Sequence, residues 1–155
     1  MSDVDATNKP GAVQDPQVGR RRILQVCGSA AGGVRAHLAD CARLLAADGH
    51  DVIVEAVRVV PDGADPVRAA IRAAVADGAR VVLTTGGTGV TPRDLTPEGT
   101  APLLAARLEG LEAQIRAHGL TKTPLAGLSR GLVGVTGRDD AGALVVNAPG
   151  SRGGV

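Results

Sequence analysis

The chain has 155 residues, 44% of them apolar, and contains no Phe, Tyr or Trp; its 17 basic and 16 acidic side chains leave a net charge of +1. This length fits one domain with a real hydrophobic core. The missing aromatic rings count against single-strand nucleic-acid binding, and the balanced charge gives no general attraction to nucleic acid or to an anionic membrane. We therefore expect any recognition of phosphate to be local.

The first segment of the chain differs in composition from the rest. Residues 1–19 carry acidic side chains and prolines but no apolar core of a signal peptide, and no run of about 18 apolar residues occurs anywhere. We expect a disordered tail over 1–19, a single domain over 20–155 and a cytoplasmic protein. Cys27 and Cys41 lack the spacing of a metal site or a disulfide framework, so we expect both to be reduced.

Strand and helix patterns alternate in the first half of the chain. Short apolar runs predict strands at Arg22–Cys27, Asp51–Val60 and Ala79–Thr84. Apolar residues at steps of three and four predict helices between them, over 34–48 and 65–78. Two strand–helix–strand units in succession favour an open, mostly parallel sheet with helices on both faces, because each crossover must be right-handed.

The boundaries of the later elements follow from capping and turn signals. Asp65 is the expected N-cap of the second helix, with Pro66 at its first position. A helical pattern resumes after Thr96-Pro97-Glu98 and continues through Leu108 and on to Gly119. Two further strands, Ser129–Thr136 and Gly142–Asn147, are predicted to form a hairpin.

A glycine-rich segment, Thr84-Thr85-Gly86-Gly87-Thr88-Gly89, directly follows the third predicted strand. Its backbone N–H groups are free to converge on an anion, and its glycines let a phosphate approach without obstruction by a Cβ atom. The segment lacks the Gly-Lys-Ser/Thr of nucleotide hydrolases and the spacing of a dinucleotide fingerprint. By itself it is equally consistent with a tight turn.

Charged residues follow the glycine-rich segment closely. Asp94 could hold a hard cation against phosphate oxygens while Arg93 neutralises them, or the two could simply pair in the loop; we favour the functional interpretation of Asp94. For Thr96 and Pro97 we favour a helix N-cap and first helical position. Asp62 follows another strand, so it could face the same crevice or be an ordinary turn residue.

Six motifs occur in order through the second half of the chain: Leu83-Thr84-Thr85-Gly86-Gly87-Thr88-Gly89, Pro92-Arg93-Asp94, Thr96-Pro97-Glu98, Lys122-Thr123-Pro124, Leu128-Ser129-Arg130-Gly131 and Asn147-Ala148-Pro149-Gly150-Ser151. Together they closely resemble the molybdopterin-binding (MoaB/Mog-like) family of molybdenum cofactor biosynthesis. The resemblance runs from about Arg22 to Val155.

The resemblance implies a three-layer α/β/α sandwich with a mostly parallel sheet and a C-terminal hairpin, commonly assembled as a homotrimer. It implies an enzyme that adenylylates molybdopterin with ATP and Mg²⁺ and releases pyrophosphate. Other molybdenum cofactor biosynthesis proteins are the partners that it implies. Such a transfer requires positioning and charge neutralisation more than a protein nucleophile.

The resemblance also assigns roles to individual residues. Asp62 and Asp94 are expected to be the catalytic carboxylates, acting through the metal. The expected substrate-binding residues are Ser29, Thr85, Gly86, Gly87, Thr88, Gly89, Glu98, Ser129, Asn147, Pro149, Gly150 and Ser151.

Two features depart from the family pattern. Ala30 follows Ser29 where an Asp is usual, and the segment 35–39 replaces an acid-containing motif at the start of the first helix. The family's last helix is expected to be absent after Pro149-Gly150-Ser151. The enzyme is the favoured interpretation; a molybdopterin-binding paralogue without catalysis, or an oligomeric scaffold, is the alternative.

Overall fold

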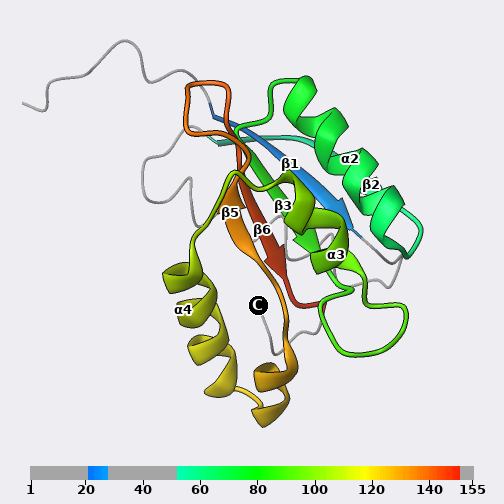
Figure 1. Cartoon of the computed structure of the whole chain (residues 1–155), viewed down its shortest axis with the longest axis vertical. Coiled ribbons are helices and arrows are strands. Elements are labelled where there is room, and N and C mark those ends of the chain that lie inside the picture. Colours follow the sequence, from blue (N-terminus) through cyan, green and yellow to red (C-terminus); the bar gives the residue numbers. More distant parts are fainter. Residues whose placement is uncertain (1–20, 28–51, 151–155) are drawn as a thin grey trace, which may run out of the picture.

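The structure is a computed structural model that describes residues 21–27 and 52–150. Its strands are β1 (Arg21–Cys27), β2 (Val52–Val59), β3 (Val81–Thr85), β4 (Ala106–Arg107), β5 (Val133–Val135) and β6 (Leu144–Ala148). Its helices are α2 (Ala64–Ala76), α3 (Thr96–Thr100) and α4 (Glu109–Leu120), with 3₁₀ turns η1 (Ala101–Leu103) and η2 (Pro124–Leu128). Figure 1 shows these elements arranged around one sheet.

The sheet has six strands in the order β2-β1-β3-β6-β5-β4. Strands β2, β1, β3 and β6 run parallel, whereas β5 and β4 add antiparallel pairs at one side. In the register of the three central parallel strands, Thr85 lies beside both Cys27 and Ala148. The carboxyl ends of β1, β3 and β6 therefore meet at one edge of the sheet. The expected mostly parallel sheet and the hairpin of β5 with β6 are both confirmed.

Helix α2 packs its apolar stripe against the centre of the sheet. Ile71 and Ala74 on α2 contact the same buried core as Val82 of β3 and Val145 of β6, and each of these four residues is at most 1% exposed. Apolar side chains at helical spacing drive this packing because their burial removes apolar surface from water. Helices α2 and α3 lie on the same face of the sheet and pack against each other (Figure 1).

The start of α2 differs from the prediction. Gly63, with φ +132°, precedes the first helical residue, and no side chain caps the helix. The expected N-cap, Asp65, lies instead inside the first turn, where its carboxylate accepts a 2.7 Å hydrogen bond from Arg68. An acidic residue there still interacts favourably with the helix dipole.

The prediction of helical structure from Glu98 through Leu108 is wrong beyond Thr100. The α-helix ends at Thr100 because Pro102 cannot continue the N–H···O=C ladder, and a 3₁₀ turn follows. The next residues form β4 and pair with β5, where a Cβ on Gly134 would lie 2.6 Å from the Ala106 carbonyl oxygen. The close approach of these two strands therefore requires glycine on β5.

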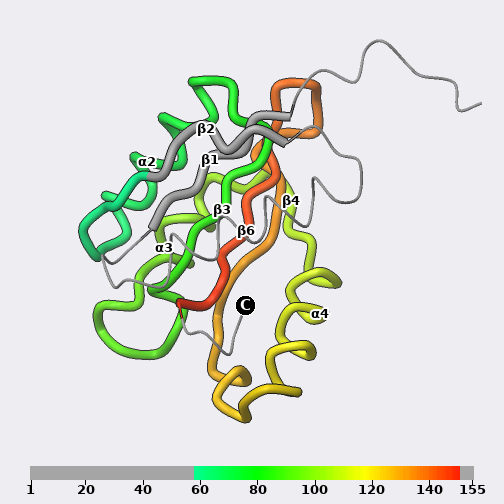
Figure 2. The backbone as a smooth tube through the Cα atoms, turned by 180° about the vertical axis from the view of Figure 1, so that it is seen from behind, coloured from blue at the N-terminus to red at the C-terminus, as the bar shows by residue number. Residues whose placement is uncertain are grey.

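The chain becomes helical again at Glu109, where α4 begins. Helix α4 lies beside β5, and η2 packs against α4 (Figure 1, Figure 2). The predicted tail over 1–19, the predicted helix over 34–48, Ser29 and Ser151 lie outside the described residues. Within the described part, none of the helices is long and apolar enough to cross a membrane.

Candidate functional site

An open cleft of about 530 Å³ lies where the carboxyl ends of β3 and β6 meet. The glycine-rich loop Gly86–Gly89 and Asp94 contribute its polar lining. Leu125, Ala126 and Leu128, all from η2, contribute an apolar lining. A site with one polar and one apolar side suits a ligand that carries both a phosphate and a ring.

The glycine-rich loop turns sharply after β3. Gly86 and Gly87 have φ of +89° and +65°, a region that side-chain-bearing residues rarely adopt. The Gly86 N–H donates to the Ala148 carbonyl at 3.1 Å, so the loop begins as a continuation of the β3–β6 pairing. The N–H groups of Gly87 and Thr88 donate to no acceptor within the part of the chain that the structure describes. A glycine-rich turn with N–H groups in this arrangement is a type of backbone that binds phosphate oxygens.

Thr96 fixes the far side of this turn. Its hydroxyl donates to the Gly86 carbonyl at 2.9 Å, and its backbone N–H donates to the Gly87 carbonyl at 3.0 Å. The predicted N-cap role of Thr96 is wrong, because Leu95 occupies the N-cap and Thr96 is the first helical residue. The hydroxyl connects α3 to the loop instead of capping the helix.

Replacing Gly87 with alanine is expected to lower the free energy of unfolding by roughly 1–3 kcal/mol, because alanine is strained at this positive φ. The added Cβ would also lie 2.4 Å from the Thr96 hydroxyl oxygen. Urea unfolding measures the effect. Gly110→Ala on α4 is the matched control, since a Cβ there meets nothing within 4 Å and alanine favours helix. Equal stability of Gly87→Ala and wild type would contradict this account.

Asp94 is held at the wall of the cleft in its ionised form. Its Oδ2 accepts hydrogen bonds from the Thr91 hydroxyl at 2.7 Å and the Thr91 N–H at 2.8 Å. These bonds, helped by the positive charge of Arg130, hold the pKa of Asp94 below its ordinary value against the opposing effect of burial. No ion pair between Asp94 and Arg93 occurs among the described residues, and Arg93 is exposed.

Asp62, the other predicted catalytic carboxylate, does not line the cleft. It is exposed in the turn between β2 and α2, and β1 separates β2 from β3, a distance of roughly 10 Å between strand axes. Across residues 21–27 and 52–150, no three His, Cys, Asp or Glu side chains cluster as a metal site. Mg²⁺ commonly takes one or two carboxylates together with substrate phosphates, so Asp94 alone fits part of such a site.

Glu98 and Thr85, predicted to contact substrate, do not line the cleft either. Glu98 is exposed on α3, where its carboxylate pairs with Arg130 and its pKa is lowered mainly by that hydrogen bond. Thr85 is only 6% exposed, and its hydroxyl has no hydrogen-bond partner.

Asn147 is a buried connector behind the cleft. Its amide nitrogen donates to the hydroxyls of Thr84 at 2.9 Å and Thr100 at 3.0 Å, and its amide oxygen accepts from the Leu132 N–H at 3.2 Å. The residue is 2% exposed. Contact of this side chain with a ligand would require breaking bonds that join β3, β6 and α3. The structure therefore places Asn147 as a support of the cleft.

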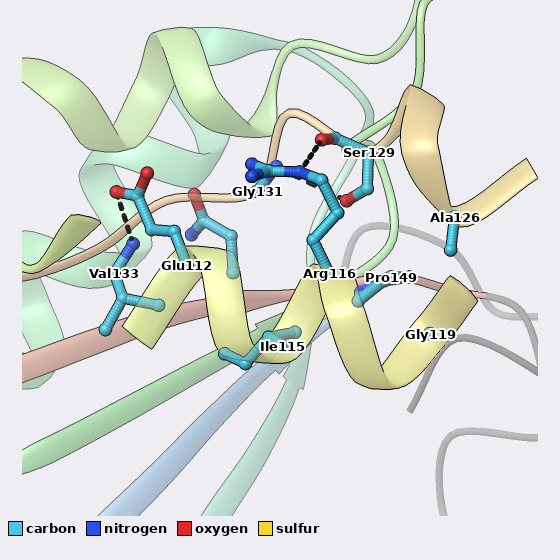
Figure 3. A pocket seen from close by; sticks show the side chains of 10 residues that line it. Glu112, Ile115, Arg116, Gly119, Ala126, Ser129, Gly131, Val133 and Pro149 are labelled. Carbon is cyan, nitrogen blue, oxygen red and sulfur yellow. Dashed lines mark hydrogen bonds between the residues drawn. The ribbon is translucent and has the colours of Figure 1, made fainter. Parts of the chain in front are cut away.

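A second, much smaller cavity of about 10 Å³ lies between α4 and the segment after η2 (Figure 3). Ser129 and Pro149 line both this cavity and the large cleft. Figure 3 shows Arg116 donating to the Ser129 carbonyl, at 3.3 Å, and the Val133 N–H donating to Glu112, at 3.1 Å. Side chains of α4 thereby hold the segment that runs from Ser129, after η2, to Val133 at the start of β5.

The structure thus brings together eight of the predicted residues at the cleft: Gly86, Gly87, Thr88, Gly89, Asp94, Ser129, Pro149 and Gly150. Behind the loop, outside the lining of the cleft, lies Arg130, a residue of the Leu128-Ser129-Arg130-Gly131 motif to which the sequence analysis assigned no role. Its Nε donates to the Gly89 carbonyl at 2.7 Å. The only sequence signal for it is its position directly after Ser129.

Residues 37–155 match the family described as "Probable molybdopterin binding domain". The chain belongs to this family. The match confirms the resemblance recognised from the motifs, and it covers both the cleft and the strands that form it.

Individual relatives agree with this assignment. The chain is 41% identical over 95 residues to the molybdenum cofactor synthesis protein cinnamon of Drosophila melanogaster, covering 61% of this chain and 15% of that protein. It is 36% identical over 94 residues to a molybdopterin adenylyltransferase of Haemophilus influenzae, covering 60% of this chain and 46% of that enzyme. The matched region is thus less than half the length of each of these two relatives.

A solved structure confirms the fold class. The molybdopterin biosynthesis enzyme MoaB of Thermus thermophilus superposes with a TM-score of 0.66 at 40% sequence identity, covering 87% of this chain and 83% of that one. The α/β architecture of this family therefore extends to the present chain.

Proposed function

We propose that this chain transfers the adenylyl group of ATP to molybdopterin in a Mg²⁺-dependent reaction that releases pyrophosphate. The observation that carries the proposal is that the Asp94 carboxylate and the glycine-rich loop line one cleft. The name of the Haemophilus influenzae relative, molybdopterin adenylyltransferase, supports the reaction.

The proposed reaction needs no protein nucleophile. An oxygen of the terminal phosphate of molybdopterin attacks the α-phosphorus of ATP, a new P–O bond forms, and the bond to the β-phosphate oxygen breaks with its electron pair leaving on pyrophosphate. The N–H groups of Gly87 and Thr88, which have no acceptor among the described residues, are suited to bind phosphate oxygens and fix the line of attack. When bound, Mg²⁺ would neutralise charge on these oxygens, and Asp94 is the residue that would hold it.

The apolar side of the cleft supplies a surface for a flat ring. Leu125 and Leu128 are 69% and 52% exposed although both are large and apolar. Covering them with a heterocycle would remove apolar surface from water. Either the pterin or the adenine would gain from this contact, while the phosphates face the glycine-rich loop.

The test is pyrophosphate release by the purified chain with molybdopterin, ATP and Mg²⁺. We expect release only when all three are present and none when any one is omitted. Binding of molybdopterin without release of pyrophosphate would identify the alternative, a non-catalytic paralogue, which the replacement of the usual Asp by Ala30 favours. A folded chain that neither binds molybdopterin nor releases pyrophosphate would indicate an oligomeric scaffold.

Assembly and location are part of the same proposal. We expect a homotrimer that works in the cytoplasm with other proteins of the pathway. The exposed leucines of α4, Leu111 and Leu120, lie outside the cleft and provide apolar surface for subunit contacts. Light scattering gives the mass, and a monomer at micromolar concentration would contradict this assembly.

A further inference from the structure

Arg130 contacts the glycine-rich loop and the residues after it at four points. Its backbone N–H donates to the Thr88 carbonyl at 2.8 Å, and its Nε donates to the Gly89 carbonyl at 2.7 Å. One terminal nitrogen donates to the Asp94 carbonyl and the other to the Glu98 carboxylate. A single side chain thus joins both ends of the segment that shapes the cleft.

All three guanidinium nitrogens of Arg130 are engaged with the protein. The positive charge faces the Glu98 carboxylate, and Arg130 is absent from the lining of the cleft. The planar fork of arginine suits such simultaneous donation to several oxygens, which an ammonium group cannot reproduce. Arg130 therefore acts on the loop and not directly on a phosphate.

The loop depends on such polar anchors because it has little apolar packing. Residues 90–93 are all exposed, and Val90 is 64% exposed. Gly86 and Gly87, at the start of this loop, give the backbone there wide conformational freedom. Among the described residues, the bonds from Arg130 join those of Thr91, Thr96 and Ser129 in holding this segment in place.

We propose that Arg130 is a positioning residue for the adenylyl transfer proposed above: it holds the segment 88–94 so that Asp94 and the loop N–H groups face the same phosphates, and Glu98 orients Arg130. The expected effect of Arg130 on catalysis rests on the proposed function, whereas its effect on the loop does not. It also accounts for Glu98, which was expected beside the ligand and lies behind the loop instead.

The first test needs no activity. Amide hydrogen exchange of the ligand-free protein is compared for wild type, Arg130→Lys and Glu98→Gln, with Arg72→Lys, exposed on α2, as the control. We expect the hydrogen-bonded amides of Asp94 and Thr96 to exchange at least about tenfold faster in the two test variants, with core amides unchanged. Unchanged exchange in this loop, or faster exchange throughout the chain, would overturn the positioning role.

The second test is kinetic and separates position from charge. Lysine keeps the charge but has one nitrogen for three acceptors, so Arg130→Lys is expected to lower kcat about 10- to 100-fold, as small misplacements do, with a much smaller change in KM. Arg130→Gln also removes the charge, so a comparable fall in kcat in both variants would assign the loss to the missing hydrogen bonds and not to the charge. Wild-type rates in Arg130→Lys would overturn the positioning role. Failure of wild type to turn over would refute the proposed function, and the exchange experiment would still decide whether Arg130 holds the loop.

Discussion

Replacing Asp94 with asparagine is expected to lower kcat/KM for pyrophosphate release at least about 100-fold, the scale seen when a group that stabilises transition-state charge is removed. Asparagine has nearly the same shape and keeps an oxygen that can accept the bonds from Thr91. It loses the negative charge that would hold Mg²⁺ against the phosphates. The effect should therefore appear in catalysis and leave the melting temperature close to that of wild type.

Two controls make this result specific to Asp94. Asp65→Asn changes an exposed carboxylate on α2 that does not line the cleft, and it should keep wild-type activity. Asp62→Asn tests the second carboxylate assigned by resemblance. Loss of activity in Asp62→Asn together with an active Asp94→Asn would move the catalytic carboxylate to the turn after β2.

The pH dependence of the wild-type reaction gives an independent check on Asp94. Because hydrogen bonds from Thr91 lower the pKa of this carboxylate, it stays ionised to more acidic pH than an ordinary Asp, whose value is about 3.9. Between neutral pH and about pH 5, protonation of Asp94 should therefore cause no loss of activity. An acid limb in this range would have to come from another group.

Replacing Glu112 with alanine is expected to lower the free energy of unfolding by about 1–3 kcal/mol, because the buried Val133 N–H loses its acceptor, whereas Arg107 is exposed and can be hydrated. Glu112 is 5% exposed, and its two oxygens accept from the Arg107 Nε at 3.1 Å and Nη2 at 2.6 Å. It also accepts from the buried Val133 N–H at 3.1 Å. Alanine would leave this N–H without a partner at the start of β5.

Glu112→Gln separates the charge from the hydrogen bond. Its amide oxygen can still accept from Val133, so its loss of stability in urea unfolding should be smaller than that of Glu112→Ala. Burial raises the pKa of Glu112, but the bonds from Arg107 and Val133 outweigh burial and leave it below its ordinary value. The stability gained from ionised Glu112 is then complete above the unfolded pKa of about 4.3 and is lost as pH falls through the folded pKa. Equal stability of all three proteins at neutral pH would contradict both predictions.

The parallel core of the fold was predictable from the sequence because it depends on local patterns. Short apolar runs marked β1, β2 and β3, and apolar spacing marked α2. The glycine-rich loop and Asp94 also follow directly from β3, so their place at the carboxyl edge of the sheet follows from topology alone.

The remaining features depend on contacts between residues far apart in the chain. Asn147 bonds to Thr84 over 63 positions, and Arg130 bonds to Gly89 over 41. Neither partner can be inferred from spacing along one element. Pro102 is itself a local signal for the end of the helix, but the strand that follows depends on distant pairing of β4 with β5.

The position of β6 in the sheet has a consequence for how the chain folds. β6 comes after the other five strands in the sequence yet lies between β3 and β5. Until it is inserted, the β2-β1-β3 and β5-β4 groups have no strand joining them, and β3 exposes unpaired backbone groups along one edge. During synthesis the cleft can therefore close only after residues 144–148 have left the ribosome. A chain interrupted before Leu144 would lack the site and retain an open edge prone to aggregation.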